Sequence, residues 1–140
     1  MRVSIAAAGT QTGAATIRAI IKANPTTEIH ALYRNLGNVP QEFKSNPAFH
    51  AAKGNIDDAS SLDFSGSNAV LVMTPPIFEN IDVLAHTKDV CNGVKEAIEK
   101  AGTVKRIFLL SSVGAEFDKG VVGFDVLVLC KLILHTNTET

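Results

Sequence analysis

The sequence predicts an α/β protein built on a doubly wound parallel sheet. Short apolar runs alternate with segments of helical periodicity, a glycine-containing turn joins the first run to the first helix, and the longest helical segment lies between two further apolar runs. Parallel strands need crossover connections, which helices usually supply. With 140 residues, 46% of them hydrophobic and 19% charged, the chain suits one globular domain with its own core.

The first part of the chain reads as strand, turn, helix and strand. Apolar residues run from Val3 to Ala7, and after the turn Ala14, Ile17 and Ile21 recur at helical spacing. Asn24-Pro25 stops this helix, because proline disfavours helical geometry in the residue before it. The remaining predictions for this part are a strand at 28–33, mostly loop over 35–47 with at most a short helix near 41–45, and a third strand at 50–53.

The second part repeats the alternation. Residues 68–73 are the clearest buried strand, and Thr74-Pro75-Pro76 closes it. A long amphipathic helix is expected over 81–101, with Gly102 just past its end. A brief helical turn at 57–62 and a fifth strand at 104–110, running into Ser111-Ser112, complete the expected elements.

The turn between the first strand and helix is a candidate pyrophosphate site. Unpaired amides at a helix N-terminus carry partial positive charge, and small residues let a phosphate approach them. Counted back from Gly13, the spacing GxxGxxG falls on Ala7, Thr10 and Gly13, with Gly9 one place early. The candidate residues are Gly9, Thr10, Gln11, Thr12 and Gly13, although a plain turn that binds no nucleotide fits this pattern equally well.

The end of the second strand indicates which dinucleotide would bind. In this kind of fold a residue roughly 20 positions beyond the glycine turn reads the ribose, an acid for NAD and an arginine for the 2′-phosphate of NADP. Arg34 follows the second strand and no acid stands at that strand end, so NADP is favoured and NAD stays possible. The alternative for Arg34 is a solvated loop residue. Asp57 and Asp58 either reach the adenine or cap the turn that follows them.

Five segments, none of them specific alone, stand in a recognisable order: Ala8-Gly9-Thr10-Gln11-Thr12-Gly13, Ala31-Leu32-Tyr33-Arg34, Gly54-Asn55-Ile56-Asp57-Asp58, Thr74-Pro75-Pro76 and Leu109-Leu110-Ser111-Ser112-Val113-Gly114-Ala115. Through them the chain resembles the NmrA-like family of atypical short-chain dehydrogenases. The resemblance implies a Rossmann-type domain that binds NAD(P). It also implies that Gly9 to Gly13 hold the pyrophosphate, Arg34 the 2′-phosphate, Asp57 the adenine side, Thr74-Pro75 the nicotinamide ribose, and Ser111-Ser112 the floor under the nicotinamide.

The resemblance leaves catalysis open. Family members divide between NADPH-dependent reductases and redox sensors that signal through a protein partner. Short-chain dehydrogenases usually reduce carbonyls with a Tyr-x-x-x-Lys pair, in which the tyrosine donates the proton. The only tyrosine of this chain is Tyr33, so that pair is absent and no catalytic residue is assigned. A reductase-related domain, a non-catalytic cofactor sensor and a fragment that binds nothing are the three hypotheses.

The last twenty residues differ from the family pattern. An almost continuous apolar stretch runs over 121–134, too short and too interrupted for a membrane span. We expect an NAD(P)-binding domain over 1–120 and an atypical apolar tail over 121–140, which could contact a protein partner or a second copy of the chain. We also expect a fold that is incomplete at the C-terminus, with the substrate region missing.

Charge and cysteine usage exclude several other functions. A net charge of -1 with both signs scattered along the chain offers no cationic surface for nucleic acid or an anionic membrane. The two cysteines and four histidines show no metal-ligand spacing, so no metal site is expected. Reduced thiols, and with them a cytoplasmic location, are the simplest interpretation of two cysteines so placed.

Overall fold

A five-stranded parallel sheet organises the molecule. The structure is a computed structural model, and it describes residues 1–74 and 82–110. The strands lie in the order β3-β2-β1-β4-β5, which matches the first five strands of the Rossmann order and confirms the predicted fold class. Their bounds are β1 (Arg2–Ile5), β2 (Glu28–Tyr33), β3 (Phe49–Lys53), β4 (Ala69–Val72) and β5 (Arg106–Leu109).

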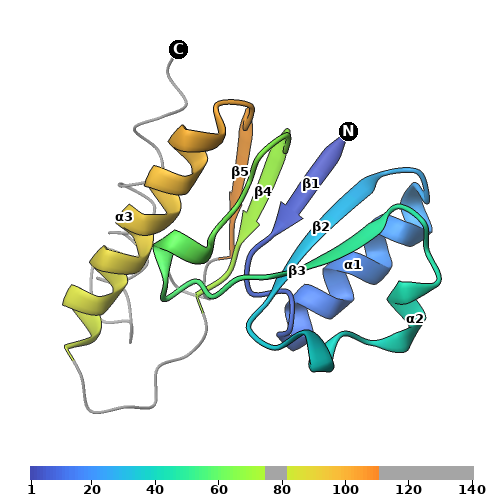
Figure 1. The fold of residues 1–140 in the computed structure, drawn as a ribbon, viewed down its shortest axis with the longest axis horizontal. Coiled ribbons are helices and arrows are strands. Elements are labelled where there is room, and N and C mark those ends of the chain that lie inside the picture. Colours follow the sequence, from blue (N-terminus) through green and yellow to red (C-terminus); the bar gives the residue numbers. More distant parts are fainter. Residues whose placement is uncertain (75–81, 111–140) are drawn as a thin grey trace, which may run out of the picture.

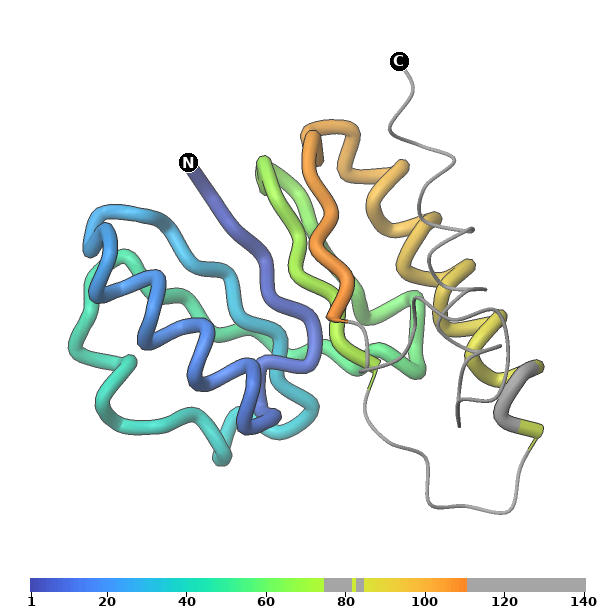
Figure 2. Tube along the Cα trace, turned by 180° about the vertical axis from the view of Figure 1, so that it is seen from behind, coloured from blue at the N-terminus to red at the C-terminus, as the bar shows by residue number. Residues whose placement is uncertain are grey.

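Helices cover both faces of this sheet. The helices are α1 (Gln11–Ala23), α2 (Gln41–Lys44) and α3 (Val83–Ala101), and two 3₁₀ turns are η1 (Leu36–Asn38) and η2 (Ala59–Ser61). Figures 1 and 2, which view the molecule from opposite sides, show α1 against one face and α3 against the other. The crossover between β3 and β4 contains η2, whereas the crossover between β4 and β5 contains α3.

Alternating side chains along the strands create one apolar core on each face. In β1, Val3 and Ile5 join the cluster around Ile17 of α1, whereas Val70 of β4 joins the cluster around Val94 of α3. Successive side chains of a strand point to opposite faces, so a short apolar run can feed both cores. This is why the strands read as continuous apolar runs in the sequence.

The two long helices end where local chemistry predicts. Thr10 caps α1: its backbone is extended and its hydroxyl accepts a hydrogen bond from the Gly13 amide. At the other end, the amide of Asn24 still bonds to the Ile20 carbonyl before Pro25 stops the helix. Gly102 follows α3 with φ +65°, the left-handed conformation expected of a residue just past a helix.

Every strand and helix expected within the described residues is present, with shifted ends. The first strand ends at Ile5 rather than Ala7, because Ala7 turns into a left-handed conformation. η1 was not expected, since residues 35–39 carry no helical periodicity. Pro75, Ser111 and the tail 121–140 lie outside the described residues, so the boundary between a domain at 1–120 and that tail stays a prediction.

Two further findings bear on the chain's surroundings. None of the helices in residues 1–74 and 82–110 has the length and apolar character to cross a membrane. Cys91, buried in α3, is disulfide-bonded, so the expectation of two reduced thiols is wrong for this residue. A disulfide depends on how closely two Cα atoms approach in space, and cysteine spacing along the sequence does not show that distance.

Candidate dinucleotide site

A cleft of about 250 Å³ opens beside the turn between β1 and α1, where the chain leaves β1, β2 and β3 at the same edge of the sheet. Open α/β sheets bind ligands at the carboxyl ends of their strands. Three segments line the cleft: Ala7, Gly9 and Thr10 from the turn, Leu32 to Asn35 with Asn38 after β2, and Gly54 to Ile56 after β3. The cleft therefore joins three of the segments that the sequence singled out.

The turn adopts the backbone conformation of a glycine turn, although alanine occupies the first position of the GxxGxxG spacing. Ala7 has φ +59°, in the left-handed region that glycine adopts freely and other residues adopt at a cost. The Ala8 amide bonds to the Leu32 carbonyl, which ties the turn to the end of β2. Ala7 thus takes the conformation that a first glycine would supply, as its position in the GxxGxxG spacing indicates.

Gly9 and Gly13 serve different purposes. A Cβ on Gly13 would lie 2.7 Å from the Ala8 carbonyl oxygen and 2.9 Å from the Ala8 Cα, so only glycine lets α1 pack this closely on the turn. A Cβ on Gly9 would meet only the Tyr33 ring, at 3.5 Å. Gly9 is therefore free of any packing requirement and leaves space in the cleft that it lines.

The N-terminus of α1 follows directly on Gly9 and Thr10, although Gln11, Thr12 and Gly13 themselves do not line the cleft. The Thr10 hydroxyl accepts from the Gly13 amide at 3.0 Å and donates to the Ala7 carbonyl at 3.0 Å. The amides of Gly9, Gln11 and Thr12 carry no hydrogen bond to any residue that the structure describes. No acidic residue stands in the first turn of α1, so its positive potential is not neutralised from within the helix. An anion is the natural partner of such a terminus.

Arg34 lies at the end of β2, lines the cleft and takes part in a small ionic cluster. Its guanidinium is 3.3 Å from Oδ2 of Asp57, and Nε2 of His86 is 3.2 Å from Oδ1 of the same carboxylate. The Arg34 side chain is 68% exposed, so the pair is a weak surface interaction that a ligand can displace. Asp57 itself is absent from the cleft lining, although its neighbours Asn55 and Ile56 belong to it.

Tyr33 forms part of the cleft wall with an unsatisfied hydroxyl. The side chain is 1% exposed, and its buried oxygen has no hydrogen-bond partner in the described part of the chain. Burial raises the pKa of this phenol, so it stays protonated. Tyr33 is therefore a neutral part of the cleft wall.

Asp58 and Thr74 are two further residues of the sequence prediction that the structure describes. Asp58 caps η2 by accepting a hydrogen bond from the Ser60 amide at 3.1 Å, so the capping interpretation is confirmed for it. Thr74 follows β4 and is partly buried. The sequence analysis did not identify three residues near the cleft: Asn35, Asn38 and His86. Their positions depend on how the turn after β2 and the start of α3 fold, and the neighbouring residues in the sequence do not show this.

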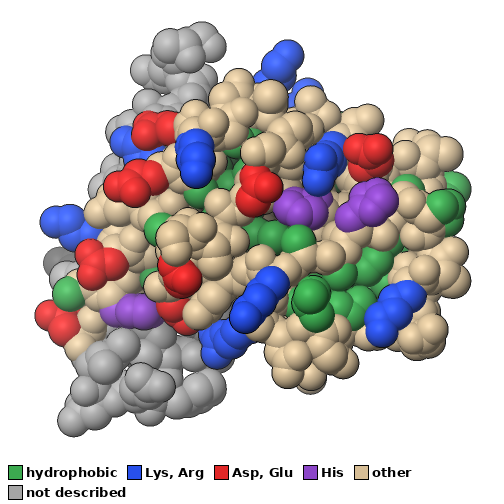
Figure 3. Space-filling view, in the orientation of Figure 1, with side chains coloured by type: hydrophobic (Ala, Val, Ile, Leu, Met, Phe, Trp, Pro, Cys, Tyr) green, Lys and Arg blue, Asp and Glu red, His purple; other side chains and the backbone are tan. Residues whose placement is uncertain are grey.

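Figure 3 shows Lys, Arg, Asp and Glu side chains mixed over the face that carries α3 and η2, without a broad region of one sign. Within residues 1–74 and 82–110, no three His, Cys, Asp or Glu side chains gather closely enough to hold a metal ion.

Comparison with solved structures identifies the same fold in two reductases and an epimerase. A triphenylmethane reductase from Citrobacter sp. is 20% identical with a TM-score of 0.77, and the match covers 97% of this chain and 45% of that one. An NADPH-dependent quinone oxidoreductase from Escherichia coli, solved with NADPH, is 21% identical with a TM-score of 0.74, covering 96% and 44%. A nucleoside-diphosphate-sugar epimerase from Staphylococcus aureus is 17% identical with a TM-score of 0.79, covering 97% and 47%.

These matches show the Rossmann-type fold. The chain spans about half the length of the proteins it matches. The Citrobacter reductase has also been solved with NADP(H), at a TM-score of 0.73 to this chain. No protein-family model and no curated protein matches the sequence.

Proposed function

We propose that this chain is an NADP(H)-binding Rossmann domain of the NmrA-like type, related to NADPH-dependent oxidoreductases. The observation that carries the proposal is the cleft that places Arg34 beside the turn before α1. The lining includes Gly9, whose amide is unpaired within the described part of the chain, and Arg34 with its guanidinium, at the edge of the sheet where this fold binds dinucleotides. Gln11 and Thr12 follow in α1, outside the lining. Two of the matched structures contain NADP(H) or NADPH, which supports the choice of ligand.

The turn fits a pyrophosphate by its backbone. The amides of Gly9, Gln11 and Thr12 would donate to the phosphate oxygens, and the dipole of α1 would add favourable electrostatic energy. The Thr10 hydroxyl already bonds to Ala7 and Gly13, so it shapes the turn and is not a phosphate donor. Gly13 keeps α1 close enough to the turn for these amides to reach the ligand.

Arg34 would distinguish NADP(H) from NAD(H). A guanidinium binds a phosphate through charge-assisted hydrogen bonds, and the 2′-phosphate is the only group by which the two cofactors differ. The assignments of Asp57 to the adenine side, of Thr74-Pro75 to the nicotinamide ribose and of Ser111 to the floor under the nicotinamide remain predictions. NADPH, when bound, would supply a hydride; the chain's own residues bind and orient it.

A cofactor sensor is the second candidate. Tyr33 is the only tyrosine of the 140 residues and is buried in β2, so these residues contain no Tyr-x-x-x-Lys pair. A domain that binds NADP(H) without turning it over could signal through a protein partner or a second copy, with the apolar tail 121–134 as the contact. We further propose a cytoplasmic location, where NADP(H) is available, and fractionation of cells tests it.

Calorimetric titration with NADPH and NADH tests the proposal. Wild-type protein should bind NADPH more tightly than NADH. Replacing Arg34 with Ala should weaken NADPH about tenfold and leave NADH unchanged, taking the low end of a charge-assisted hydrogen bond because the side chain is exposed. Arg18 is the matched control, since it is also an exposed arginine paired with a carboxylate but lies on α1 outside the cleft.

The outcomes separate the candidates. Equal losses for both cofactors in the Arg34 variant would refute its assigned role, and no binding of either cofactor to the wild type would refute the function. NADPH binding with turnover of a carbonyl or quinone substrate favours the reductase-related domain. Binding without turnover favours the sensor.

A further inference from the structure

We propose that Asp57 is a specificity-determining residue: its carboxylate is an internal counter-ion of Arg34 that the 2′-phosphate of NADP(H) displaces onto His86. The inference rests on the proposed function and deepens it. It concerns how the chain sets its preference between two cofactors that differ by one phosphate.

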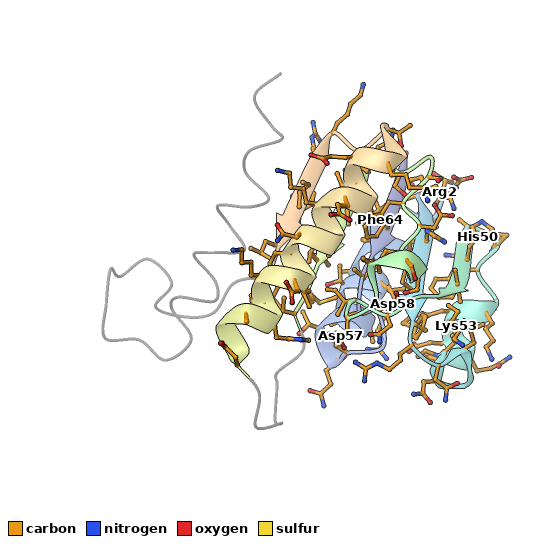
Figure 4. The ribbon with its side chains drawn as sticks, turned by 60° about the vertical axis from the view of Figure 1, so that its left-hand side comes forward. Arg2, His50, Lys53, Asp57, Asp58 and Phe64 are labelled. Carbon is orange, nitrogen blue, oxygen red and sulfur yellow. The ribbon has the colours of Figure 1, made fainter. Side chains whose placement is uncertain are left out.

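Three elements bring the three side chains together. Arg34 follows β2, Asp57 lies in the loop after β3, and His86 is in the first turn of α3. The two oxygens of Asp57 are divided between them, with Oδ2 at 3.3 Å from Arg34 and Oδ1 at 3.2 Å from His86. Figure 4 shows Asp57 at the carboxyl end of the sheet, far from Arg2 at the other end.

The backbone at Asp57 is held in place independently of Arg34. The Asp57 amide donates to Oδ1 of Asn55 at 3.2 Å, and the Asp58 amide donates to the Asn55 carbonyl at 2.9 Å. This compact turn fixes the backbone that carries the carboxylate. Asp57 is therefore a standing partner of Arg34 in the ligand-free chain, and His86 offers it a second partner.

A competition between two anions follows. The 2′-phosphate and the Asp57 carboxylate both seek the guanidinium of Arg34, and an incoming phosphate is also repelled by a carboxylate left beside it. Binding NADP(H) therefore requires Arg34 to leave Asp57. NAD(H) has no 2′-phosphate, so its binding does not require this exchange.

Removing the Asp57 charge and removing His86 should change the preference for NADPH over NADH in opposite directions. Asp57→Asn removes the competing charge and should tighten NADPH binding about twofold to fivefold, the range of an exposed ion pair. His86→Ala removes the group that receives the carboxylate, so Arg34 stays more firmly paired and NADPH should bind about twofold more weakly. NADH affinity should change in neither variant. A contact of Asp57 with the adenine would instead change both cofactors together.

Asp58→Asn is the matched control. Asp58 is the adjacent carboxylate with the same charge, but Oδ1 of its side chain accepts from the Ser60 amide at 3.1 Å and the Ser60 hydroxyl at 2.6 Å. Asparagine caps as well as aspartate, so this variant removes a nearby charge without disturbing the turn. It should leave the ratio of NADPH to NADH affinity close to that of the wild type.

The experiment is calorimetric titration of the full chain and these three variants with NADPH and NADH at one ionic strength. The side-chain nitrogen–proton signal of Arg34 in ligand-free protein is recorded alongside, and it should shift in the Asp57 variant and not in the Asp58 variant. Opposite changes of the cofactor ratio in the Asp57 and His86 variants support the inference.

An unchanged ratio in the Asp57 variant, or equal changes in the Asp57 and Asp58 variants, overturns the inference while the proposed function stands. If wild-type protein binds neither cofactor, the proposed function fails and the inference falls with it.

Discussion

Replacing Gly13 with Ala separates the structural role of the turn from its binding role. The new Cβ would lie 2.7 Å from the Ala8 carbonyl oxygen and 2.9 Å from the Ala8 carbonyl carbon and Cα. These are backbone atoms, so the contact is relieved only if α1 moves away from the turn.

Two opposing effects set how much unfolding free energy Gly13→Ala loses. Forcing an extra carbon into a packed site costs about 2–3 kcal/mol at such distances, whereas alanine is favoured over glycine in a helix by about 1 kcal/mol. The net loss of unfolding free energy is about 1–2 kcal/mol, which corresponds to a fall of roughly 4–10 °C in Tm for a chain of this length.

Gly9→Ala is the companion variant. Its Cβ meets only the Tyr33 ring, at 3.5 Å, so its unfolding free energy should stay within about 0.5 kcal/mol of the wild type. Because Gly9 lines the cleft, this variant should bind NADPH and NADH more weakly by the same factor. Thermal and urea unfolding followed by circular dichroism, together with calorimetry, measure both effects. A Gly13 variant as stable as the wild type, or a Gly9 variant that loses stability, would refute this reasoning.

Three further predictions concern stability. Ala7→Gly relieves the left-handed strain at φ +59° and should raise the unfolding free energy by about 0.5 kcal/mol after the entropy cost of glycine; a loss in urea unfolding would contradict this. Tyr33→Phe removes a buried hydroxyl without a partner among the described residues and should stabilise by about 1 kcal/mol, whereas destabilisation would show that the hydroxyl is bonded. Burial, reinforced by the charge of Arg2, lowers the pKa of His30 below its ordinary value of 6.5, so the unfolded chain takes up a proton first and stability should fall as pH drops below about 6.5. His30→Gln should flatten this dependence in urea unfolding between about pH 5 and 7.5, and a dependence that stays unchanged would contradict this assignment.

The fold was predictable because it rests on local patterns. The apolar runs before the turn at residues 8–13 and before Thr74 mark buried strands, and Gly102 marks the end of α3. These features depend on residues within one turn or one strand of each other, so the sequence displays them directly.

The site was predictable only in part. Arg34 and the glycine turn were found because their spacing is set by the length of one β-α-β unit. The spacing marked Thr10 as a phosphate-site candidate, and it did not show that the Thr10 hydroxyl accepts from the Gly13 amide and caps α1. His86 was missed because its proximity to Asp57 depends on how α3 packs across the sheet, and sequence separation carries no sign of that contact.

The central claim is that NADP(H) binds in the cleft between the α1 turn and Arg34. Titrating isotope-labelled protein with NADPH and following backbone amide and arginine side-chain signals by NMR tests it most directly. Saturable shifts should appear and be largest at the amides of Gly9, Gln11 and Thr12 and at the side chain of Arg34. Absence of saturable shifts, or shifts confined to β5 and the far end of α3, would contradict it.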